Sequence, residues 1–133
     1  MSEALAIDEI VLRVPASADY ARVVRVGAAA VALRQGMSFT EIDELRAAMD
    51  EATELLLAQP AADGAAIECV FRANGGCLEV EARRTDEASV AATDAARFKK
   101  TVDASNVTAT VESDRGWLLM RKPVGRPGSR PAA

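Results

Sequence analysis

The stretch between Thr40 and Pro60 places the strongest constraint on the fold. Its apolar residues recur three and four positions apart, so they share one side of a helix: Ile42, Leu45, Met49, Ala52, Leu55 and Leu56. The sequence Thr-Glu-Ile-Asp that begins at Thr40 is close to a capping box, with Asp in place of Glu. We therefore expect a helix that starts after Thr40, ends by Pro60 and buries one face against a second layer.

Strand-like segments supply that layer. They are rich in β-branched and alternating residues and comprise residues 9–14, 66–73, 77–83, 107–111 and 117–121. Asn74-Gly75-Gly76 predicts a hairpin turn between the second and third segments, and residues 113–116 predict another between the last two. Glu79 and Glu81 alternate with apolar neighbours, which indicates that one face of the segment 77–83 is exposed to solvent. Pro15 ends the first segment and favours an edge position.

Two further helices are expected. The first covers residues 17–35, with Ser17 as N-cap, Gly36 as stop, and a buried stripe of Tyr20, Val23, Val24, Gly27 and Val31. The other lies within residues 86–103 and has a poorly defined beginning. The order of strand, two helices, hairpin, helix and hairpin predicts an α+β fold, a two-layer sandwich with helices on one face of a mixed, largely antiparallel sheet.

Length and charge limit what the chain can be. A chain of 133 residues accommodates one domain, which we assign to residues 1–123, followed by a Pro- and Gly-containing tail over 124–133 that we expect to be disordered. The formal net charge is −4, with both signs interspersed, so we expect no direct nucleic-acid partner. No apolar run reaches the roughly 20 residues of a membrane span, and the N-terminus is acidic, so we expect a cytoplasmic protein without membrane association.

The residues available for chemistry are few. There is no histidine, which excludes histidine acid–base catalysis and imidazole-dependent zinc sites. Cys69 and Cys77 flank the Gly-containing turn; we expect two reduced cysteines, with a disulfide under oxidation as the alternative.

Residues 12–23 and 42–52, together with the ending 106–123, carry a resemblance to a known family. They resemble the anti-sigma factor serine kinases of bacterial partner switching, which belong to the GHKL superfamily of ATPases and kinases. The resemblance extends over nearly the whole chain up to Pro123. It implies the two-layer fold already expected, and it implies a nucleotide site whose motifs can be compared with this sequence.

The metal and base motif is only half present. In the family, Glu-x-x-x-Asn on the second helix supplies a catalytic carboxylate and an amide oxygen for Mg²⁺. Glu51 matches the first position, but Leu55 stands at the second. Because Mg²⁺ needs oxygen ligands, an isobutyl group there argues against a metal site. Without a metal, Glu51 is more simply a partly exposed helix carboxylate.

The two glycine motifs of the family are absent. The place of Asp-x-Gly-x-Gly, whose Asp recognises adenine, is occupied by residues 82–88, which contain Asp86 but no glycine. The Gly-rich phosphate lid should fall within residues 88–98, which also lack glycine and contain Asp94. We therefore expect neither ATP nor Mg²⁺ as a cofactor.

The partner-binding segment is better preserved. In the kinases resembled here, the arginine at the position of Arg22 contacts both the sigma factor and the STAS-domain anti-anti-sigma factor, and we group Tyr20 and Arg25 with it. An ordinary surface arginine is the simpler alternative for Arg22. We predict a non-enzymatic, anti-sigma-like binding module. The alternatives are a working ATP- and Mg²⁺-dependent serine/threonine kinase, with Glu51 as base and Asp86 on adenine, and a structural homodimer.

Overall fold

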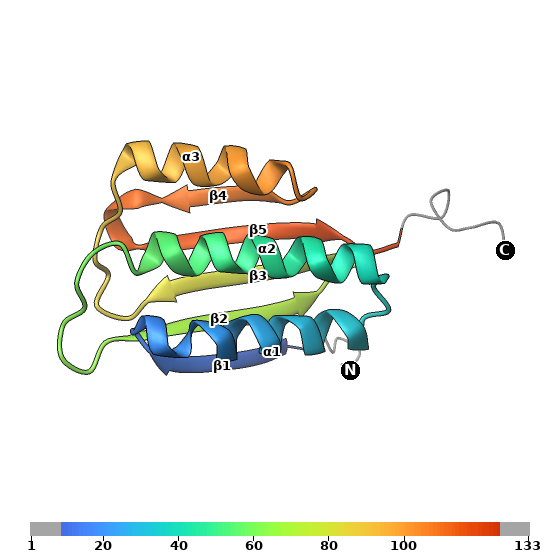
Figure 1. Cartoon of the computed structure of the whole chain (residues 1–133), viewed down its shortest axis with the longest axis horizontal. Coiled ribbons are helices and arrows are strands. Elements are labelled where there is room, and N and C mark those ends of the chain that lie inside the picture. Colours follow the sequence, from blue (N-terminus) through green and yellow to red (C-terminus); the bar gives the residue numbers. More distant parts are fainter. Residues whose placement is uncertain (1–8, 126–133) are drawn as a thin grey trace, which may run out of the picture.

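The computed structural model describes residues 9–125, which form a two-layer α/β sandwich with three helices on one face of a five-stranded sheet (Figure 1). The predicted α+β class is confirmed. The elements in chain order are β1 (Glu9–Pro15), α1 (Ala21–Arg34), α2 (Phe39–Leu56), β2 (Ala66–Ala73), β3 (Cys77–Arg84), α3 (Ala92–Asp103), β4 (Thr108–Glu112) and β5 (Trp117–Pro123).

The sheet has the strand order β1-β2-β3-β5-β4. All of its pairings within residues 9–125 are antiparallel, so the mixed character that we expected is not found there. The order follows from two hairpins, β2–β3 and β4–β5, of which the second lays β5 beside β3. β1 forms one edge, as Pro15 indicated, and β4 forms the other.

Glycines close both predicted hairpins. Gly75 and Gly76 have φ of +57° and +84°, the left-handed region that the Asn-Gly-Gly turn requires. Gly116 also has a positive φ of +55°, and a Cβ added there would lie 2.4 Å from the backbone oxygen of Ala88. No other residue fits at position 116 without moving the backbone of residue 88.

The start of α2 differs from the prediction. The N-cap is Ser38: its Oγ accepts from the backbone N–H of Glu41 at 3.1 Å, and Glu41 Oε1 accepts from the N–H of Ser38 at 2.8 Å. The capping box predicted at Thr40 is therefore wrong by two residues. Ser38 and Glu41 form the complete Ser-x-x-Glu motif, which outcompetes a Thr-x-x-Asp whose shorter side chain reaches less far.

The first predicted helix is divided. Ser17 caps a short 3₁₀ turn over residues 18–20, accepting from the N–H of Asp19 at 3.2 Å, and the α-helix begins only at Ala21. The buried side of α1 consists of Val24, Ala28, Val31 and Ala32. Our assignment of Tyr20 and Val23 to that side is wrong, because both side chains are exposed.

The other boundaries shift by a few residues. α3 begins at Ala92, so the poorly defined first part of residues 86–103 is a turn and loop. At the C-terminal end, the N–H of Val124 donates to Gly76 O at 2.8 Å and that of Gly125 to Glu41 Oε2 at 2.7 Å, so the ordered backbone continues past the predicted domain end at 123. The rest of the predicted tail, 126–133, lies outside the described residues.

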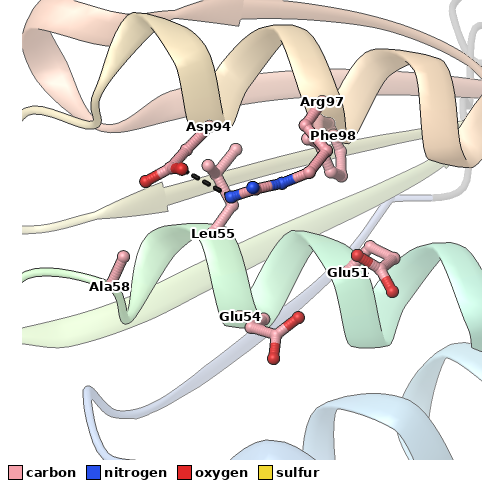
Figure 2. A pocket seen from close by; sticks show the side chains of 7 residues that line it. All are labelled: Glu51, Glu54, Leu55, Ala58, Asp94, Arg97 and Phe98. Carbon is pink, nitrogen blue, oxygen red and sulfur yellow. Dashed lines mark hydrogen bonds and ion pairs between the residues drawn. The ribbon is translucent and has the colours of Figure 1, made fainter.

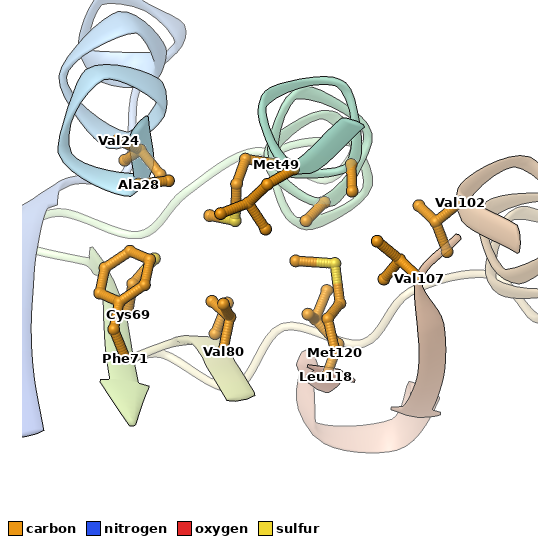
Figure 3. Packing of buried hydrophobic residues seen from close by; sticks show 14 of the residues in the cluster. Val24, Ala28, Met49, Cys69, Phe71, Val80, Val102, Val107, Leu118 and Met120 are labelled. Carbon is orange, nitrogen blue, oxygen red and sulfur yellow. The ribbon is translucent and has the colours of Figure 1, made fainter. Parts of the chain in front are cut away.

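The core lies between α2 and the middle of the sheet (Figure 3). α2 lies between α1 and α3 and buries Leu45, Met49 and Leu56 against sheet residues such as Phe71 and Met120. Each such side chain contributes about 1.5–3 kcal/mol on burial. The predicted α2 stripe therefore supplies the central contact of the fold.

The opposite face of the sheet is covered by ion pairs, as the alternation around Glu79 and Glu81 predicted. They run across neighbouring strands at 2.8–3.0 Å: Arg72–Glu9, Arg72–Glu81, Arg83–Glu68 and Arg121–Glu79. The side-chain N–H of Trp117 also donates to Glu81 at 2.7 Å. These charged and polar groups pair with one another within the face.

Both cysteines are free thiols. Cys69 points into the core opposite Ala82, whereas Cys77 lies beside the hairpin turn, opposite Pro123. Burial raises the pKa of Cys69 to about 12, so its thiol is protonated and unreactive at neutral pH. None of the helices between residues 9 and 125 combines the length and apolarity needed to cross a bilayer.

Candidate functional site

A hollow of about 120 Å³ lies between α2 and α3 (Figure 2). The residues that line it are Glu51, Glu54, Leu55, Ala58, Asp94, Arg97 and Phe98. Glu51 and Leu55, to which the resemblance assigns the base and the lost metal ligand, therefore share one surface. They do so because positions four apart lie on one side of a helix.

The chemistry of this hollow does not suit a magnesium nucleotide. Leu55 is buried and presents only carbon, and Arg97 pairs with Asp94 at 2.6 Å, one turn earlier on the same helix α3 (Figure 2). Three carboxylates, of Glu51, Glu54 and Asp94, surround the space and would repel phosphate. Ligand pockets usually enclose about 300–1,000 Å³, so the hollow is also too small for a nucleotide.

A second polar constellation lies at the end of α2, where Arg84 of β3 is fully buried. Its Nη1 donates to the backbone oxygens of Leu56 at 3.0 Å and Gln59 at 2.6 Å, and its Nη2 donates to Pro60 O at 3.1 Å. These carbonyls have no helical partner because α2 ends there. We call this arrangement, together with Asp86, the Arg84 junction.

Asp86 completes the Arg84 junction. Its Oδ1 accepts from Arg84 Nε at 2.9 Å and its Oδ2 from Nη2 at 2.6 Å, a bidentate pair. Backbone N–H groups of Ala62 and Ala88 add bonds of 3.2 and 3.4 Å. The hydrogen bonds from Arg84 lower the pKa of Asp86 to about 2, so the group is a carboxylate at all ordinary pH values. Both oxygens are occupied, which leaves none for adenine.

Sequence reasoning did not identify Arg84 as important. A signal was present: Leu78, Val80, Ala82 and Arg84 occupy every second position of β3, which places all four on the core face. An arginine on that face requires several acceptors. The pattern does not reveal that these acceptors come from residues 56–60.

The three residues predicted to bind a partner lie at the start of α1 but differ in their surroundings. Arg25 pairs with Asp50 of α2, with N–O distances of 3.1 and 3.3 Å, so it links two helices of its own domain. Tyr20 is exposed at the N-cap position. Arg22 is exposed, and it makes no ion pair with any residue from 9 to 125.

The two candidate sites of this α+β sandwich are therefore the small acidic hollow between α2 and α3 and the Arg84 junction. Within residues 9–125, no three His, Cys, Asp or Glu side chains gather as they would around a metal ion. Comparison with protein-family models and with curated proteins finds no match.

Proposed function

We propose that this chain is a regulatory binding module of the anti-sigma type, which recognises a sigma factor or a STAS-domain anti-anti-sigma factor and does not use ATP. The proposal is supported by the resemblance along the chain, by the small acidic hollow beside Leu55 and by the pairing of Asp86 with Arg84. The observation that carries it is the Arg84 junction.

The Arg84 junction stands where the resemblance assigns adenine recognition. The residues that would hold the base are replaced by a buried guanidinium bonded to three carbonyls and to Asp86. Adenine binding at Asp86 would require breaking the bidentate pair. Breaking a buried pair leaves an uncompensated charge and is strongly unfavourable.

We expect calorimetric titration with ATP and Mg²⁺ to give no binding up to millimolar nucleotide. The matched variant Leu55→Asn restores the amide of the family motif, and we expect no binding there either, because the Arg84 junction and the small hollow remain. Micromolar binding by the natural chain would overturn the proposal in favour of the kinase alternative. In that case Glu51→Gln should abolish serine phosphorylation of a STAS-domain protein.

We expect Arg22→Ala to weaken binding of the sigma factor or STAS-domain protein by about tenfold or more. Hydrogen bonds to charged groups contribute about 1.5–3 kcal/mol, and each 1.4 kcal/mol is a factor of ten. The partner would be captured from host cells, identified by mass spectrometry, purified and titrated. Arg46→Ala, on the exposed side of α2, is the control and should leave the affinity for the partner unchanged. Equal affinity of the Arg22 variant and the natural chain would argue against this surface.

A further inference from the structure

α1 has a second apolar side that nothing in the described structure covers. Val23, Val26 and Leu33 are 45, 58 and 65% exposed, and Ala30 lies exposed among them. They are spaced three, four and three positions apart, so they form one line along the helix. We call these four residues the outer stripe.

The outer stripe makes α1 unusual for a surface helix. Its inner side, with Val24, Ala28 and Val31, already packs on the sheet and α2. A helix that is apolar on both sides is normally covered on both sides. The line from Val23 to Leu33 is about 15 Å long, at 1.5 Å per residue, which matches about three turns of another helix.

The charges on α1 itself all have one sign, although the exposed Asp19 lies in the short turn just before the helix. α1 contains Arg22, Arg25 and Arg34 and no acidic residue. Arg25 is neutralised by Asp50. Arg22 and Arg34, near the two ends of the stripe, form no ion pair with residues 9–125. A helix that covers the stripe therefore meets positive charge at each end.

This charge pattern argues against a second copy of the chain as the occupant. A copy docked through its own α1 brings another Arg22 and another Arg34 to the contact and no acidic residue of that helix, whichever way the two helices run. The pairing would gather positive charge that nothing on α1 neutralises, which disfavours it.

We propose that the outer stripe docks an amphipathic helix of another protein, whose apolar line is flanked by Asp or Glu. The spacing suits helix-on-helix packing with anchors three and four residues apart, and arginine forks suit carboxylates on the partner. This inference rests on the proposed function, since it names the chemistry of the partner of that binding module.

The test is a titration of the full chain with two labelled synthetic helical peptides of three heptads. One has Leu at the a and d positions and Glu at e and g; the other has Lys in place of Glu. We expect saturable binding of the Glu peptide and at least about tenfold weaker binding of the Lys peptide, because only the first complements Arg22 and Arg34.

Val26→Glu should lower the affinity of the chain for the Glu peptide by about tenfold or more, because it places a carboxylate in the middle of the apolar contact. Val11→Glu is a matched control, since Val11 is 56% exposed but lies on the opposite face of the sheet. It should leave binding unchanged. Circular dichroism would verify that both variants are folded.

Absence of Glu-peptide binding, or equal binding of both peptides, would overturn the inference. So would a dimer in sedimentation equilibrium that Val26→Glu dissociates, because the occupant would then be a second copy. Each of these results leaves the proposed function to be judged separately, by the ATP titration and by the Arg22-dependent affinity for a purified partner.

Discussion

Replacing Arg84 with methionine is expected to lower the free energy of unfolding by about 3–5 kcal/mol, the range measured when one partner of a buried ion pair is removed. The variant retains the volume but leaves the oxygens of Leu56, Gln59 and Pro60 without their donor. It also leaves Asp86 without its bidentate partner. Urea unfolding followed by circular dichroism would measure the loss.

The neighbouring arginine gives a matched control. Arg83 lies on the opposite face of β3, is partly exposed and pairs with Glu68 at 3.0 Å. Exposed ion pairs contribute about 0–1 kcal/mol, so Arg83→Met should have a small effect. If the two variants lost the same stability, the Arg84 junction would not be the structural support that we describe.

The pH dependence of the free energy of unfolding provides a second test of the Arg84 junction. The pKa of Asp86 falls from 3.8 to about 2 on folding, chiefly because Arg84 donates to the carboxylate. A lowered folded pKa adds stability that is fully present above the unfolded pKa and is lost as the pH falls toward about 2. In Asp86→Asn, the change of stability between about pH 4 and pH 2 should therefore be smaller than in the natural chain.

The architecture could be predicted because its signals are local. The α2 stripe, the Asn-Gly-Gly turn and the alternation in β3 each determine one element, and the short hairpins then determine most strand pairings. α1 was harder. Periodicity identifies the buried side only when the other side is polar, and Val23 and Val26 make both sides of this helix apolar.

The candidate site could be predicted only in part. The i,i+4 spacing of Glu51 and Leu55 places them on one side of α2, and both line the hollow between α2 and α3. The resemblance gave Asp86 the adenine role only in the kinase alternative, and the ion pair that Asp86 makes with Arg84 was not foreseen. The bonds of Arg84 to residues 56–60 depend on how α2 ends over the sheet, which no local pattern contains.

The second large effect concerns Lys122, whose ammonium is almost fully buried beneath the N-terminal half of α2. Its Nζ donates to Glu44 Oε1 at 2.5 Å and to Ser105 O at 3.0 Å. Glu44 is less buried, and its other oxygen accepts from Asn106 Nδ2 at 2.7 Å. The pair links α2 to β5 and to the loop after α3.

Because the two partners differ in burial, the two single variants should differ in stability. Glu44→Leu leaves a buried ammonium with one carbonyl, and we expect a loss of about 3–5 kcal/mol. Lys122→Met leaves the Glu44 carboxylate in contact with water and Asn106. This variant should therefore lose clearly less stability than Glu44→Leu. The double variant removes both charges and should recover much of the stability that Glu44→Leu loses, a coupling that a double-mutant cycle measures. Equal losses for the single variants, or additive losses in the double variant, would show that burial does not govern this pair.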